Sequence, residues 1–141
     1  MTSEAHWEHF EHGADIGVRG IAPTKAQAFE QCARSLIAAI ADLASIHGDE
    51  CVEIACSAAD DELLLVEWLN ELVYEMSVRR LVFGRFDVAI TDHALSAKAW
   101  GEPVGTLSQP PTVEPKGATY TALDVTQRLD GTWLAQCVVD V

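Results

Sequence analysis

Long apolar segments are absent from this sequence. No stretch of its 141 residues approaches the roughly 20 consecutive apolar residues that a membrane-spanning helix needs. The first residues also do not place an apolar run after a basic segment, which is the pattern of a secretory signal. We therefore expect a cytoplasmic protein that does not bind membranes.

Basic residues are also scarce. The sequence has 9 Lys and Arg residues against 22 Asp and Glu residues, which leaves a formal net charge of -13. A charge of this sign repels the phosphates of nucleic acids and of anionic membranes. We therefore predict that the protein does not bind nucleic acid directly.

The short motifs of several common enzyme classes are missing. The sequence contains no GxxxxGK[ST] phosphate loop, no GxGxxG segment that opens a helix, no GxSxG nucleophile turn and no HExxH zinc motif. Its four cysteines form no CxxC pair and lie within apolar patterns, at Cys32, Cys51, Cys56 and Cys137. We interpret them as reduced thiols of the core rather than as zinc ligands.

The sequence does contain enough apolar residues for one core. Hydrophobic residues make up 49% of the chain, and a chain of this length folds without disulfides or a structural metal. We predict a single domain over residues 1–141.

Two segments have the spacing of amphipathic helices. Thr24 can cap the first, Gln27 completes a capping box, and apolar residues then repeat at helical spacing up to Ile40. The second begins after Asp60, and its acidic first turn suits the positive end of a helix dipole. The apolar stripe of this second helix consists of Leu65, Trp68, Leu69, Leu72, Val73 and Met76.

The remaining segments alternate as strands and hairpins. Turns are predicted at residues 12–15, 92–93 and 130–131, and the last hairpin includes a strand through Tyr120, Leu123 and Val125. Residues 101–117 are rich in proline and predict a long surface loop. We predict an α+β fold, a two-layer sandwich in which a mostly antiparallel sheet packs against the two helices.

Asp15 and Asp140 stand at opposite ends of the sequence, yet the first and last strands of a small sheet are often neighbours. If the two carboxylates meet, they would share a proton or recruit a cation, and hard divalent ions prefer oxygen ligands. Val141 follows directly, so that its free carboxylate could complete an oxygen cluster. The alternative is that Asp140 is an ordinary solvated acid.

Other polar residues suggest supporting roles. His6, His9 and His12 recur every three residues, but a strand would place His9 on the opposite face from the other two. His12 could orient Asp15 or act as an acid or base near neutral pH, or could be a simple turn residue. Lys116 could pair with an acid or with a phosphate of a partner, or could be solvated.

These motifs together resemble the archease family. Residues 12–17, His-Gly-Ala-Asp-Ile-Gly, are similar to the archease signature His-Thr-Ala-Asp-(Ile/Val)-Gly. Gly13 replaces the usual Thr, and Thr121 stands where many relatives carry a His. Further similarity covers nearly the whole chain, at residues 67–72 (Glu-Trp-Leu-Asn-Glu-Leu), 81–83 (Leu-Val-Phe), 101–103 (Gly-Glu-Pro), 116–120 (Lys-Gly-Ala-Thr-Tyr) and 140–141 (Asp-Val).

The resemblance implies a function. Archeases are accessory proteins, not enzymes, that activate the GTP-dependent RNA ligase of tRNA splicing by promoting its guanylylation and its repeated turnover. By position, the family's metal site, typically with calcium, would consist of Asp15, Asp140 and Val141. His12 and Lys116 would support this site or contact the ligase. The family fold includes an inserted strand, helix and two strands.

Two other functions remain open from the residues alone. A small metal-dependent phosphoesterase could use the same acids to hold a divalent ion, with His12 as general acid or base. A non-catalytic, chaperone-like binding module could instead recruit a protein through its acidic surface and the proline-rich loop. Turnover of a cyclic phosphate without a partner would indicate the first, and a dispensable metal site the second.

Overall fold

The computed structural model describes residues 4–141. Within this range, β1 and β2 form a hairpin before the first helix, and a second helix lies between the first three strands and the last five. In chain order the elements are β1 (His6–His12), β2 (Asp15–Ala22), α1 (Lys25–Ile40), a 3-10 turn (Leu43–Ser45), β3 (Glu50–Ser57), α2 (Asp61–Arg79), β4 (Leu81–Thr91), β5 (Ala94–Pro103), a second 3-10 turn (Val104–Thr106), β6 (Gly117–Ala118), β7 (Asp124–Gln127) and β8 (Trp133–Asp140).

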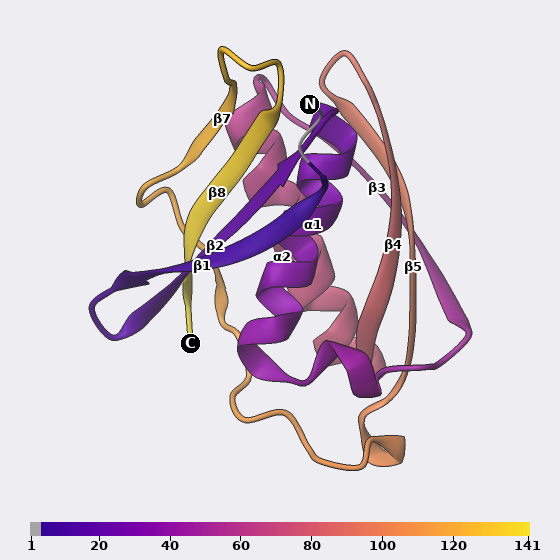
Figure 1. Ribbon diagram of the computed structural model, residues 1–141. Helices are drawn as coiled ribbons and strands as arrows, with labels where there is room; N and C mark the ends of the chain where they lie inside the picture. Colours follow the sequence, from indigo (N-terminus) through magenta and orange to yellow (C-terminus); the bar gives the residue numbers. More distant parts are fainter. Residues whose placement is uncertain (1–3) are drawn as a thin grey trace.

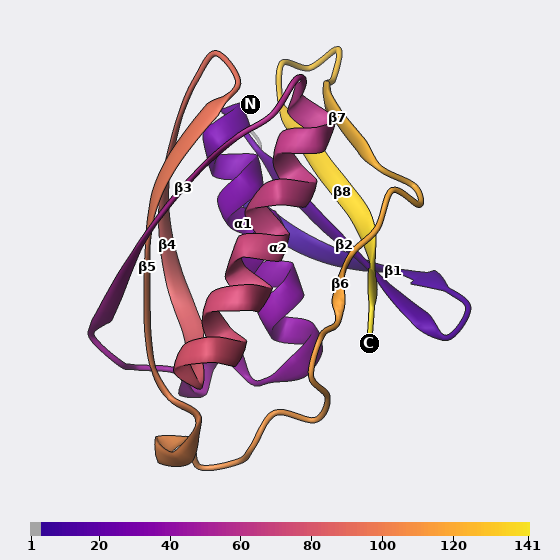
Figure 2. The same ribbon diagram turned by 180° about the vertical axis from the view of Figure 1, so that it is seen from behind.

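The strands form two antiparallel sheets. In the first sheet the order is β1-β2-β8-β6, with β7 also paired to β8, and in the second sheet the order is β3-β5-β4. Figures 1 and 2 show α1 and α2 between the two sheets. Both helices contact strands of both sheets. The predicted α+β class is confirmed, and the strands that were expected in one sheet divide into two.

The two sheets differ in how the chain builds them. The second sheet comes from one continuous segment, residues 50–103, which has the order strand, helix, strand, strand. This is the inserted unit that the resemblance implied. The first sheet instead joins the two ends of the chain, because β2 pairs with β8. Residues near the start of the sequence therefore lie beside residues near its end (Figure 1).

Both helices begin where the sequence predicted. The Thr24 hydroxyl oxygen accepts a hydrogen bond from the Gln27 backbone N–H at 3.2 Å. The Asp60 carboxylate accepts one from the backbone N–H of Leu63 at 2.8 Å. Each cap satisfies a donor that the first helical turn leaves without a partner inside the helix.

Trp68 joins the two helices inside the core. Its side chain is fully buried, and its indole N–H donates a hydrogen bond to the backbone oxygen of Phe29 at 3.1 Å. Its ring also meets the edge of Phe86 from β4, at 5.9 Å between centroids. Of the helices in residues 4–141, none is both long enough and apolar enough to cross a membrane.

The cysteine prediction is partly wrong. Cys32 and Cys137 are buried, and burial raises the pKa of the Cys137 thiol to about 12. Cys56 is half-buried and Cys51 is exposed. Both of these lie on β3, which is an edge strand of a three-stranded sheet, and residue 51 falls on the outward face of that strand. All four thiols are free, as predicted.

The predicted strand through Tyr120 is also wrong in part. Residues 119–123 form a bend in which Ala122 has a φ of 54°, and the strand begins only at Asp124. Tyr120 is 70% exposed. The bend is held by a hydrogen bond from the Val138 N–H to the Thr121 oxygen, at 3.0 Å. A strand pattern of apolar residues was therefore overridden by a contact with distant β8.

Candidate functional site

The β1–β2 hairpin positions the first candidate acid. His12 and Asp15 are the last paired residues of this hairpin, and Gly13 lies in the turn between them with a φ of 61°. Left-handed backbone of this kind favours glycine over a residue with a side chain. The departure from the family signature at position 13 therefore suits the turn of this chain, and it leaves Asp15 at the first position of β2.

The β2–β8 pairing brings the second acid to the same end of the sheet. The last paired residues are Ile16 and Val139, and Asp15 and Asp140 are the next residues along the two strands. Beyond this pair the hairpin tip turns away from the C-terminal end of β8 (Figure 1). Asp15 is half-buried, and Asp140 is exposed. The two acids are thus neighbours in register, and no hydrogen bond or ion pair joins them in the described chain.

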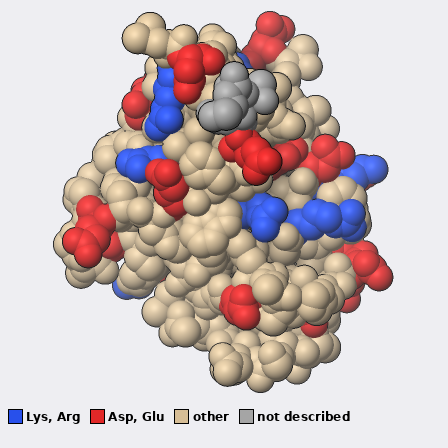
Figure 3. All heavy atoms as spheres, in the orientation of Figure 1, with Lys and Arg blue, Asp and Glu red and all other residues tan. Residues whose placement is uncertain are grey.

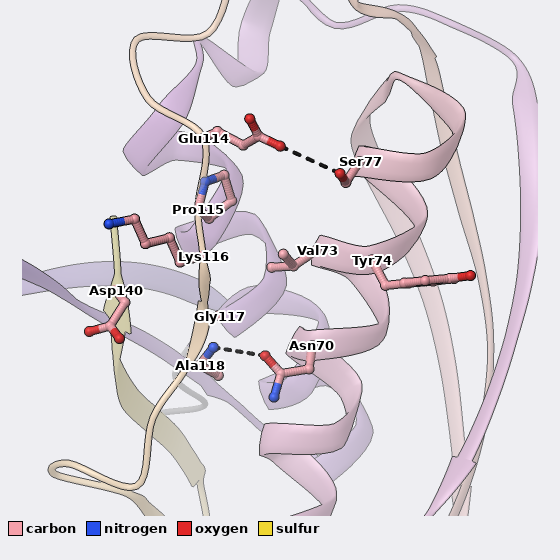
Figure 4. Close-up of a pocket in the computed structure, with 10 residues that line it drawn as sticks. All are labelled: Asn70, Val73, Tyr74, Ser77, Glu114, Pro115, Lys116, Gly117, Ala118 and Asp140. Carbon is pink, nitrogen blue, oxygen red and sulfur yellow. Dashed lines mark hydrogen bonds between the residues drawn. The ribbon is translucent and has the colours of Figure 1, made fainter.

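Strand β6 places Lys116 beside the same end of β8. Gly117 pairs with Asp140, and the Lys116 backbone N–H donates a hydrogen bond to the Asp140 backbone oxygen at 2.9 Å. Figure 4 shows the side chains of Lys116 and Asp140 on the side of β6 that faces away from α2. Among the described residues, Asp15, Asp140 and Lys116 take part in no ion pair within 4.0 Å.

A hollow of about 850 Å³ lies between α2 and the segment that leads into β6. Asn70 forms part of its wall, and its side-chain oxygen accepts a hydrogen bond from the Ala118 N–H at 2.8 Å (Figure 4). A longer hydrogen bond of 3.5 Å runs from the Ser77 hydroxyl to Glu114. Asn70 thereby fixes β6 next to Asp140. The sequence included Asn70 only as part of a motif and did not predict this role.

Asp15 lines a different hollow. That hollow lies under the hairpin tip and is bounded by the end of α1 at Ala38 and Ala39. The two acids therefore reach the same end of the first sheet from two sides, Asp15 from the hairpin and Asp140 from β8.

The donors at this end of the sheet are carboxylate oxygens, which suit hard divalent cations. The side chains of Asp15 and Asp140 supply two such groups, and neither is neutralised by a Lys or Arg within 4.0 Å in the described chain. In residues 4–141, no group of three or more His, Cys, Asp and Glu side chains is arranged to hold a metal ion. A cation at Asp15 and Asp140 would therefore need a further oxygen ligand.

The histidines do not form a metal face. The segment is a strand, and His9 points towards α1, where its Nε2 lies 2.8 Å from the Ser35 backbone oxygen. His6 lies 3.2 Å from the carboxylate of Glu8. His12 remains at the hairpin tip, paired in register with Asp15. The prediction that the strand separates His9 from its neighbours agrees with this geometry.

Comparison with known proteins identifies the family. The sequence model of the archease protein family matches residues 7–141. This chain belongs to the archease family. A protein named archease from Pyrococcus furiosus is 37% identical over 139 residues, which cover 96% of this chain and 98% of that protein. Another from Methanosarcina barkeri is 36% identical over 147 residues, and the match covers both proteins completely.

Solved structures support the fold of this archease-family chain. The solution structure of protein 1598 from Methanobacterium thermoautotrophicum has a TM-score of 0.82 and 24% identity, and it covers 96% of this chain and 98% of that one. The crystal structure of an archease from Thermotoga maritima, described as a possible chaperone, has a TM-score of 0.58 and 17% identity, with 95% and 96% coverage. At these identities the likeness shows the fold alone.

Proposed function

We propose that this archease-family chain is not itself an enzyme but activates a GTP-dependent RNA ligase in tRNA splicing or RNA repair. Activation consists of promoting ligase guanylylation and multiple turnover. The observation that carries the proposal is the register of the first sheet, in which Asp15 and Asp140 follow directly after the last pair of β2 and β8. Family membership over residues 7–141 supports the same function.

The proposed activity depends on a divalent metal, most simply Ca²⁺. Asp15, Asp140 and the carboxylate of Val141 would hold it, because an all-oxygen donor set suits a hard cation. When bound, the ion supplies a fixed positive charge at this end of the sheet. In this proposal His12 orients Asp15, which the pairing of the two residues in the hairpin register supports. In this proposal Lys116 contacts the ligase, which its backbone hydrogen bond to Asp140 supports by holding it beside the acids.

The net charge of -13 favours a basic protein partner over direct contact with RNA. A ligase that binds RNA and GTP must present basic groups around its channel. Complementary fields raise the rate of association of two such proteins. In this proposal the chain acts in the cytoplasm, binds no nucleic acid directly and does not bind membranes.

The test combines the purified chain, with its native C-terminus, with the RNA ligase of the same organism. Guanylylation and multiple-turnover ligation are followed for the wild type and for Asp15→Asn and Asp140→Asn, which keep the shape of each side chain and remove its charge. Asp49→Asn is the matched control, because Asp49 is exposed in the segment before β3. We expect Asp15→Asn and Asp140→Asn to abolish activation and Asp49→Asn to retain it.

Two outcomes would overturn the proposal. Activation that persists in the Asp15→Asn/Asp140→Asn double variant would show that the acids are dispensable. Hydrolysis of a 2′,3′-cyclic phosphate by the chain alone, lost in the same variants, would instead identify a phosphoesterase. Calorimetric titration with Ca²⁺ provides an independent readout, because wild type should bind the ion and both single variants should bind it at least about tenfold more weakly.

A further inference from the structure

Helix α2 carries a stripe of exposed residues along its outer face, and Asn70 is the member that also contacts β6. The stripe consists of Leu63, Glu67, Asn70, Tyr74 and Val78, which recur at helical spacing and are all exposed. Leu63 is 37% exposed, Tyr74 59% and Val78 62%. These three are half of the six large apolar side chains that are exposed in residues 4–141. Exposed apolar groups are therefore concentrated on one helix face.

Local folding does not account for Tyr74 and Val78. Tyr and Val are weaker helix formers than Glu, Lys or Ala, so an exposed position that serves only the helix would favour one of those. The side-chain hydrogen bonds of this part of α2 come from Asn70, Ser77 and Arg79, and the Tyr74 hydroxyl makes none within residues 4–141. Tyrosine is among the residue types that most often anchor protein interfaces. The α2 stripe thus has the composition of an interface rather than of a solvated helix face.

The charges along α2 are mostly acidic, and its one basic residue, Arg79, lies in the last turn and pairs with Glu75. From Asp61 to Val78 the helix has five acidic residues and no Lys or Arg. Two of the acids, Glu67 and Glu71, lie close enough to the half-buried Cys56 on β3 to raise the pKa of its thiol further, beyond the effect of burial. Glu67 within the stripe and Glu71 beside it therefore lie on the side of α2 that faces Cys56 of β3. By contrast, acidic and basic groups are interspersed on the face of the molecule seen in Figure 3.

The α2 stripe is continuous with the hollow that adjoins the candidate metal site. Asn70 and Tyr74 belong to the stripe and also line the hollow together with Lys116 and Asp140. In Figure 4, Asn70 points to Ala118 while the Tyr74 ring points away from Lys116 and Asp140, across the outer side of α2. A protein that fills the hollow would therefore meet Asn70 and Tyr74 on its α2 wall and Lys116 and Asp140 on its opposite wall.

We propose that the α2 stripe is the surface on which the RNA ligase docks, through an apolar pocket that receives Tyr74 and Val78 and a rim of Lys and Arg that faces Glu67 and Glu71. This inference rests on the proposed function, since it assigns the partner from it. The stripe determines affinity, whereas the Asp15 and Asp140 end determines activation. The two roles are separable by experiment.

The test is a titration of the chain into a fixed concentration of ligase, with the initial rate of guanylylation as readout. The half-saturating concentration reports docking, and the plateau rate reports activation. We expect Tyr74→Ala/Val78→Ser to raise the half-saturating concentration by about tenfold or more with an unchanged plateau. Leu129→Ala removes a fully exposed apolar side chain in the turn before β8 and should change neither value. Thermal unfolding checks that both variants remain folded.

The charge of the rim is tested separately. Glu67→Lys/Glu71→Lys should slow association with the ligase by about tenfold at low salt, and the difference from wild type should shrink at high salt. Asp49→Lys/Glu50→Lys makes the same change of net charge at exposed positions at the start of β3. This control should have the smaller effect. Equal effects of the two double variants would overturn the assignment of the rim to α2.

The outcomes distinguish the docking surface from the proposed function. If wild type activates the ligase and Tyr74→Ala/Val78→Ser has an unchanged half-saturating concentration, the docking surface is wrong and the proposed function stands. If that variant lowers only the plateau, docking on the stripe is equally wrong. If wild type neither binds nor activates the ligase, the proposed function is wrong, and the partner assigned to the stripe is wrong with it.

Discussion

The hydrogen bond between Asn70 and Ala118 offers a direct test of how β6 is held beside Asp140. Asn70→Ala removes the acceptor for the Ala118 N–H, which now has a partner at 2.8 Å. β6 contains only Gly117 and Ala118 and pairs with β8 at Asp140 and Val139. The Asn70 side chain therefore supplies a large part of the interaction that holds this short strand against α2.

The size of the effect follows from two opposing contributions. Loss of one intramolecular hydrogen bond costs about 0.5–1.5 kcal/mol. Replacing Asn by Ala inside a helix returns up to about 0.7 kcal/mol, because Ala has the higher helix propensity. The free energy of global unfolding should therefore change little. Opening of β6 alone should become easier by the full cost of the hydrogen bond, which corresponds to roughly 2- to 12-fold faster exchange.

Amide hydrogen exchange at Ala118, followed by NMR in the native state, is the assay that resolves this local opening. Ser77→Ala is the matched control, since the Ser77 hydroxyl makes only an exposed hydrogen bond of 3.5 Å on the same face of α2. We expect faster exchange at Ala118 in Asn70→Ala and unchanged exchange in Ser77→Ala. An Ala118 amide that exchanges at the wild-type rate in Asn70→Ala would refute the assigned role of Asn70.

Three further predictions follow from the core and from titrating groups. Trp68→Ala should lower the free energy of unfolding by about 3–5 kcal/mol in urea titrations, because the side chain is fully buried and hydrogen-bonded; a loss below about 1 kcal/mol would contradict this. Burial raises the pKa of the Glu30 carboxyl above its ordinary value of 4.5, and this effect is larger than the opposite effect of the hydrogen bond from the Val88 N–H, which lowers the pKa. The folded chain therefore keeps this proton to higher pH than the unfolded chain does. The free energy of unfolding of wild type should therefore fall as pH rises from 4.5 through the raised pKa. Glu30→Gln lacks the carboxyl, so its stability relative to wild type should increase over the same pH range. A stability difference that stays constant with pH would show that Glu30 does not cause the pH dependence. Alkylation of the native protein, read by mass spectrometry, should be fast at the exposed Cys51 and slower at the half-buried Cys56, whose pKa is raised to about 11. The buried Cys32 and Cys137 should react only after unfolding. Early labelling of either buried thiol would contradict this order.

The helix starts were predictable because capping is a local interaction. Thr24 and Asp60 each bond to a backbone N–H three residues later, so a short window of sequence contains both partners. The position of His9 was predictable for a similar reason, since alternation along a strand depends only on the strand itself. These features needed no knowledge of the rest of the fold.

The error at Tyr120 occurred where a distant segment decided the outcome. Tyr120 follows an apolar alternation, yet residues 119–123 bend because Val138 supplies a hydrogen-bond donor to Thr121. The error at Cys51 has a different origin, because the alternation that buries Val52 and Ile54 by itself places residue 51 on the outward face of β3. A pattern of apolar residues indicates that a segment alternates, but it does not say which strand lies beside it.

The candidate site also combines features that the sequence predicted with features that only distant contacts decide. The sequence identified Asp15, Asp140, His12 and Lys116 by residue type and by resemblance to the archease family, and this needed no coordinates. It could not predict that Asn70 holds β6, because that hydrogen bond joins a helix to a strand 48 residues later in the chain. The metal and the partner stay predictions.

The sequence by itself determined the α+β class, the starts of both helices, the turn at Gly13 and the acidic character of the surface. Each of these depends on neighbouring residues or on composition. Only the tertiary structure decided that the strands divide into two sheets, that Asp15 and Asp140 follow the last pair of β2 and β8, and that Tyr74 and Val78 of the α2 stripe remain exposed. The physical reason is that pairing between distant strands and helix packing minimise the exposed apolar surface of the whole chain, which no local window of sequence contains.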